Sequence, residues 1–130
     1  MKKEFVFRPR GRFLQIPDPV LWFVIKIRPA SMGKLFLYLY FISIGTGSEV
    51  TPKISVRDLA AILNMKKSKM YDNLKTLQEM GALEVVEQDN LGTAYRLLLP
   101  QENGGFLPAD KTPYLWEKGK RKQFSQDTLF

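Results

Sequence analysis

The stretch of sequence that decides the fold is SVRDLAAILNMKKSKMYDNLKTLQEMGALEV, residues 55–85. The apolar residues of its first part recur at the spacing of one face of an amphipathic helix: Val56, Leu59, Ala60 and Leu63. Ser55 precedes this run and Asp58 follows three residues later, a pattern similar to a capping box at a helix start. The pair Asn64 and Met65 then predicts a tight turn.

A second amphipathic helix follows the turn. Met70, Leu74 and Leu77 lie on one of its faces, and Gly81 stands where a glycine commonly follows the last helical residue. The two helices should cross through their apolar faces, so we expect four leucines to be buried together: Leu59, Leu63, Leu74 and Leu77.

Two strand-like runs come next. Residues 83–88 and 93–99 alternate between apolar and polar side chains, and residues 89–92, Asp-Asn-Leu-Gly, between them are typical of a hairpin turn. The predicted fold class is therefore mainly α with a small antiparallel β-hairpin.

The rest of the chain extends this unit on both sides. Residues 1–17 predict a basic N-terminal arm, and residues 19–27 a short buried helix. A second helix from Ser31 to about Ile44 is apolar on most faces and should occupy the middle of a domain that spans residues 18–100. Residues 101–130 are rich in glycine, proline and polar residues, which predicts an extended polar C-terminal tail.

Composition restricts the chemistry. The chain of 130 residues has 20 lysines and arginines against 13 acidic residues, a net charge of +7 that favours a polyanionic partner. It contains no cysteine and no histidine, which excludes thiol nucleophiles, histidine-based dyads and the usual zinc sites. No acid–base or nucleophile constellation is visible, so we expect no enzymatic activity, no cofactor and no metal.

The apolar runs at 20–27 and 35–44 are too short to span a bilayer, which takes roughly 20 apolar residues. Charged residues and a proline between them prevent their fusion into one span. We therefore expect a cytoplasmic protein without a membrane partner.

Taken together, residues 54–99 resemble the helix-turn-helix and wing of bacterial winged-helix DNA-binding proteins. The resemblance rests on Asp58-Leu59-Ala60, Leu63, Met65, Tyr71, Leu74, Leu77 and Gly81 before the hairpin. A weaker resemblance links the region ahead of the helix-turn-helix to the N-terminal domains of plasmid and phage replication-initiation proteins. These resemblances imply a winged helix-turn-helix with a three-helix core that binds double-stranded DNA, as a transcriptional regulator or a replication-initiator module.

The second helix of the motif begins with lysines. Cations oppose the helix dipole there, whereas a phosphate in front of the helix would be attracted by the lysines and by free backbone N–H groups. The residues expected on exposed or flanking faces, and so as DNA contacts, are Lys66, Lys67, Ser68, Lys69, Tyr71, Asn73 and Lys75. The alternative is a solvated, charged turn without a ligand.

The hairpin and the arm complete the candidate site. Glu84, Glu87 and Asp89 leave Arg96 as the only cation of the hairpin, so Arg96 is the DNA contact expected from it, and the acidic tip is an unfavourable partner for the minor groove. The basic arm offers other phosphate or minor-groove contacts, foremost Arg8, Arg10 and Arg12.

DNA binding has one alternative among the functions of this fold. The same fold can serve as a protein–protein assembly or adaptor module without direct DNA reading. In that case the apolar N-terminal helices would bind a replication or transcription protein, or a second copy in a homodimer.

Overall fold

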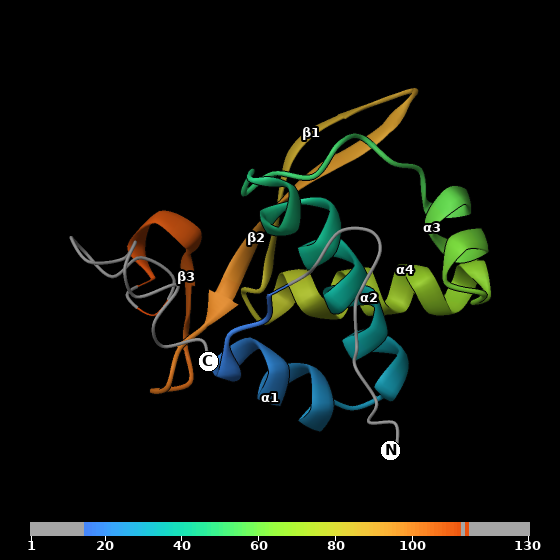
Figure 1. Cartoon of the computed structure of the whole chain (residues 1–130). Helices are drawn as coiled ribbons and strands as arrows, with labels where there is room; N and C mark the ends of the chain where they lie inside the picture. Colours follow the sequence, from blue (N-terminus) through green and yellow to red (C-terminus); the bar gives the residue numbers. More distant parts are fainter. Residues whose placement is uncertain (1–14, 113, 115–130) are drawn as a thin grey trace, which may run out of the picture.

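A computed structural model describes residues 15–112 and 114 (Figure 1). Within these residues the fold is a mixed α/β arrangement of four α-helices and a three-stranded antiparallel sheet. Residues 1–14 of the predicted basic arm and most of the predicted tail lie outside the described residues. The elements are α1 (Asp18–Lys26), α2 (Ala30–Ile42), the 3-10 turn η1 (Ile44–Thr46), α3 (Val56–Ile62), α4 (Lys67–Glu79), β1 (Leu83–Asp89), β2 (Gly92–Pro100), β3 (Phe106–Pro108) and the 3-10 turn η2 (Ala109–Lys111).

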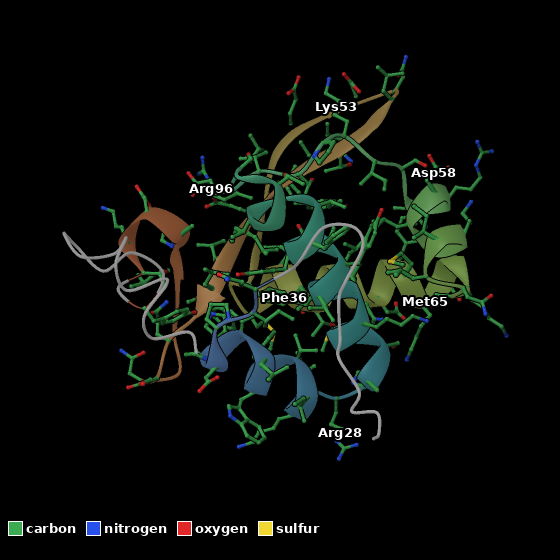
Figure 2. The ribbon with its side chains drawn as sticks, in the orientation of Figure 1. Arg28, Phe36, Lys53, Asp58, Met65 and Arg96 are labelled. Atoms are coloured by element: carbon green, nitrogen blue, oxygen red, sulfur yellow. The ribbon has the colours of Figure 1, made fainter. Side chains whose placement is uncertain are left out.

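Helix α2 is the centre of the core. It packs against α1, η1 and α4, and its buried side chains include Leu35, Phe36 and Leu39. Figure 2 shows Phe36 in the interior, where α1 and α2 meet. The prediction of an apolar helix in the middle of the domain is therefore confirmed, although α2 ends at Ile42 and η1 takes the last turn.

Helices α3 and α4 form as the pattern predicts. The Ser55 hydroxyl accepts a hydrogen bond from the Asp58 backbone N–H at 3.0 Å and so caps α3. The turn into α4 passes through Asn64, whose φ of 55° is left-handed. Four leucines are buried in one cluster, as expected: Leu59, Leu63, Leu74 and Leu77.

The sheet has β2 in its middle. Strand β1 pairs with one edge, with an irregular register between Val85 and Glu87, and β3 pairs with the last residues of β2. The segment 49–54, which connects η1 to α3, hydrogen-bonds along the edge that β1 leaves free: the Thr51 N–H donates to the Tyr95 carbonyl at 2.8 Å. The connection between the first and second pair of helices is thus tied to the hairpin.

The hairpin turn depends on a glycine. Gly92 has a φ of 138°, and a Cβ there would lie 2.6 Å from the carbonyl carbon of Ile54. The Ile54 and Thr93 backbones exchange two hydrogen bonds of 3.1 Å beside it. A side chain at this position would therefore push the 49–54 segment away from β2.

The predicted helices and small antiparallel hairpin are present, but the predicted fold class is incomplete, because a third strand joins the sheet and makes the fold mixed α/β. Two further expectations need correction. The region after Pro100 is not an extended tail throughout, because Phe106 packs edge-on against Phe23 at 5.4 Å and brings β3 to β2. The helix over 19–27 is not buried all round, because Trp22 and Ile25 of α1 point outward and are exposed.

Candidate nucleic-acid interface

The start of α4 carries the densest group of exposed cations on the described helices. Lys66 is the N-cap residue, and Lys67 and Lys69 fall in the first turn. All three side chains are exposed, and no described residue forms an ion pair with them. No side chain caps the helix either, so its first N–H groups remain available. Each cation at a helix N-terminus costs about 0.3–1 kcal/mol, so this end is electrostatically favourable only toward an anion.

The outward face of α4 continues this surface. Ser68, Tyr71, Asp72 and Lys75 are all exposed. Tyr71 also interacts electrostatically with Tyr95 of β2, whose pKa is raised first by burial and further by this neighbour. The face therefore presents hydroxyls, an aromatic ring and cations together, with one carboxylate among them.

Asn73 does not belong to this surface. Its side chain is 3% exposed, and its amide nitrogen donates to the Ser31 hydroxyl of α2 at 3.0 Å and to the Met65 sulfur at 3.6 Å. Since Asn73 follows Met70 by three residues, it lies on the core face of α4. The expectation of an exposed or flanking position is wrong, and Asn73 leaves the set of candidate contacts.

Arg96 is occupied by carboxylates. Its Nη1 lies 3.1 Å from Glu84 Oε1 on the neighbouring strand, and its Nε lies 3.9 Å from Glu49 Oε1. The Nε and Oε1 atoms of that second pair are buried and have no hydrogen-bond partner. Arg96 thus ties β1 and the 49–54 segment to β2, and two carboxylates, those of Glu84 and Glu49, lie against its positive charge.

The remaining acids of the hairpin are held by Lys53. The ammonium lies 2.5 Å from Asp89 and 3.1 Å from Glu87, and Figure 2 shows Lys53 beside the hairpin. The hydrogen bond to Lys53 lowers the pKa of Asp89, and the bonds to Asp89 and Glu87 raise the pKa of Lys53. Each carboxylate of the hairpin therefore has a cation against it, with one ammonium serving both Glu87 and Asp89, and the tip presents the exposed Leu91.

The structure brings together only part of the predicted site. Lys66, Lys67, Ser68, Lys69, Tyr71 and Lys75 lie on one helix, whereas Arg96 lies on β2 among carboxylates. Arg8, Arg10 and Arg12 lie outside the described residues. The sequence missed the ties made by Lys53 and Glu49, because no local signal links a loop residue to a hairpin more than thirty positions away.

Comparison of the chain with protein-family models, with curated proteins and with solved structures finds no match. Among the described helices, none is long and apolar enough to cross a membrane. Within the same residues, no group of three acidic side chains is arranged to hold a metal ion.

Proposed function

We propose that this chain is a winged helix-turn-helix protein that binds double-stranded DNA, with α4 as the helix that enters the major groove. The fold supports the proposal in its order of elements, since α3, a short turn and α4 are followed by the β1–β2 hairpin. The 49–54 segment joins the hairpin beside α3, which makes the helix pair and the hairpin one unit.

The observation that carries the proposal is the unbalanced charge at the start of α4. Lys66, Lys67 and Lys69 are exposed without a carboxylate partner in the described part of the chain. The acids of the hairpin are paired with other cations, Glu87 and Asp89 with Lys53 and Glu84 with Arg96. A row of DNA phosphates would satisfy both the lysines and the free N–H groups of the helix.

The neighbouring residues divide into two roles. The lysines fix the position of the helix through phosphates, which carries no sequence information by itself. Ser68, Tyr71 and Asp72 are the groups that reach base edges: a hydroxyl serves any base, a ring contacts a thymine methyl, and a carboxylate accepts from cytosine N4. The hairpin, with its charges paired, contributes little to phosphate binding.

We infer the biological role, transcriptional regulation or replication initiation, from the family resemblance of the sequence. A transcriptional regulator and a replication-initiation module both require recognition of duplex DNA, so one binding experiment bears on both.

The experiment compares two double charge reversals. Lys67→Glu with Lys69→Glu removes two proposed phosphate contacts. The control, Arg28→Glu with Lys111→Glu, makes the same change in net charge at other positions. Figure 2 shows Arg28 at the end of the molecule away from the hairpin. Affinity for a random duplex is measured over a range of salt concentrations. The α4 variant should bind more weakly, and its slope of log K against log salt should flatten by about 1.8.

Circular dichroism establishes that both variants remain folded. The control pair should change the affinity modestly and leave the slope near the parent value. If the α4 variant keeps both its affinity and its slope, α4 does not face DNA.

A second candidate function has its own support. Helix α1 presents an exposed apolar face, which suits an assembly module better than a DNA-reading domain. Under this alternative, the parent protein would show no salt-dependent binding to duplex DNA at all.

A further inference from the structure

Helix α1 is apolar on two opposite faces. Its inner face packs on the core: Val20 is fully buried, and the Phe23 ring meets Phe36 of α2 edge-on at 4.9 Å. Its outer face exposes Leu21, Trp22 and Ile25, at 37%, 54% and 58%. Single apolar side chains on a surface need no explanation, but three within little more than one turn of a helix form a patch.

The outer face also carries one charge at each end. Asp18 is in the first turn of α1 and Lys26 in the last, and both are exposed. Asp18, Trp22 and Lys26 are four residues apart and therefore share one stripe of the helix. The Lys26 ammonium lies 5.5 Å from the centre of the Trp22 ring, which confirms that these two side chains are on the same side.

This stripe is complementary to itself. A rotation by 180° about an axis through Trp22 exchanges the positions of Asp18 and Lys26, so the acid of one copy meets the base of the other. We propose that α1 pairs with α1 of a second copy, antiparallel, with Trp22 on the two-fold axis. Asp18 of each copy then faces Lys26 of the other, twice per dimer, over a stripe of about 12 Å.

The patch is small, which sets the strength of the dimer. Three partly exposed apolar side chains and two ion pairs amount to less than the roughly 800 Å² per partner of a standard stable interface. We therefore expect a weak, concentration-dependent dimer. Two DNA half-sites on one duplex would hold two copies close together and strengthen it without any new contact.

The location of α1 permits pairing while the rest of the surface stays accessible. Figure 1 shows α1 at the lower end of the molecule, with the hairpin tip at the upper end and α3 at the right. The inference does not depend on the proposed function, because the pairing is measured in the absence of DNA.

The first test exchanges the charges, using the full chain. Asp18→Lys and Lys26→Asp each place like charges opposite one another, whereas the double variant restores both pairs with reversed sign. Sedimentation from micromolar to millimolar concentration should show self-association of the parent. Each single variant should weaken it by about five- to tenfold, since two ion pairs become repulsive, and the double variant should recover most of the loss.

If the variants lost self-association because they unfold, the double variant would lose the most. Reversed charges at both ends of a helix oppose its dipole most in the double variant, so a loss caused by instability would be greatest there. Melting curves of all four proteins separate the two causes. A parent that stays monomeric at millimolar concentration, or a double variant that associates no better than the single ones, overturns the proposal.

The second test uses the absence of cysteine from the chain. Trp22→Cys introduces one thiol at the proposed axis, and Ile62→Cys on α3, where the parent side chain is 52% exposed, is the matched control. Under mild oxidation without DNA, the Trp22→Cys protein should form a disulfide-linked dimer well before the control does. Equal rates of disulfide formation for the two proteins would contradict pairing through α1. A thiol at position 22 that does not react because another part of the same chain covers this face would contradict it as well.

Discussion

Helix α4 and the β1–β2 hairpin follow one another in the chain but treat their charges in opposite ways. The lysines of α4 are exposed and have no carboxylate partner among the described residues. The acids of the hairpin are each paired, Glu84 with Arg96 and Asp89 with Lys53. The net charge of a segment therefore does not say which of its charges are available to a ligand.

The two regions differ in anchoring as well. The inner face of α4 is buried through four positions, whereas β1 is exposed at every residue after Leu83. Beyond its base, the hairpin is held by Lys53 and by the backbone bonds between Ile54 and Thr93. We therefore regard α4 as a fixed platform and β1 as the weakly buried strand of the hairpin, whereas β2 is largely buried.

The largest expected effect is on the anchoring of α4. Leu74→Ala removes a buried side chain from the crossing of α3 and α4 and should cost about 2–5 kcal/mol of unfolding free energy. Val85→Ala on the exposed part of β1 should change it by about 0.5 kcal/mol or less. Chemical denaturation of both variants measures the difference. Equal stabilities would show that α4 is no better anchored than the hairpin.

The next effect separates the two faces of α4. Asn73→Ala should destabilise the fold by about 1–3 kcal/mol, because it leaves the Ser31 hydroxyl without its partner. Ser31→Ala and the double variant complete a thermodynamic cycle, in which the double loss should be smaller than the sum of the single ones. The DNA affinity of the folded Asn73→Ala protein should match the parent. A specific loss of binding at unchanged stability would return Asn73 to the interface.

A smaller effect is expected on DNA affinity, when the hairpin turn and the basic arm are altered in turn. Deletion of residues 1–12 removes five cations and should weaken DNA binding about tenfold or more near physiological salt, through two to four lost phosphate contacts. Replacement of residues 89–93 by a shorter turn should weaken it less, because the charges there are already paired. Melting temperatures must be measured on the same proteins. A truncated chain that stays folded and binds at full strength contradicts a role for the arm.

The smallest effect concerns the tie between Lys53 and Asp89. The Asp89 pKa should lie below the ordinary 3.8 in the folded protein, because the carboxylate accepts a hydrogen bond from Lys53. A depressed pKa means that the contact stabilises the hairpin above pH 3.8 and is lost as the pH falls through the folded value. Carbon NMR of the Asp89 carboxyl measures this midpoint. Lys53→Met should raise it, whereas Lys111→Met should leave it unchanged.

Local pattern was sufficient for much of the fold. The spacing of Leu59, Leu63, Leu74 and Leu77 predicted a buried crossing of two helices, and all four are in the core. Ser55 marked the start of α3, and Gly81, with a φ of 90°, follows the end of α4. These features depend on neighbours within a few positions, so they can be read along the chain. The exposed lysines of α4 were also predicted, because they occupy the positions that the apolar face leaves to solvent.

What the sequence determined by itself is thus the four helices, the β1–β2 hairpin and the apolar side chains through which α3 and α4 pack on each other. Only the tertiary structure decided which polar groups form hydrogen bonds or ion pairs with distant residues. Asn73 is buried because Ser31 meets it from a helix 42 positions earlier, and Asp89 is paired because Lys53 reaches it from 36 positions away. It likewise decided that β3 completes the sheet, and that the apolar Trp22 of α1 faces outward. The physical reason is common to all of these: periodicity records which side chains avoid water, whereas a polar partner depends on which distant segment packs beside it.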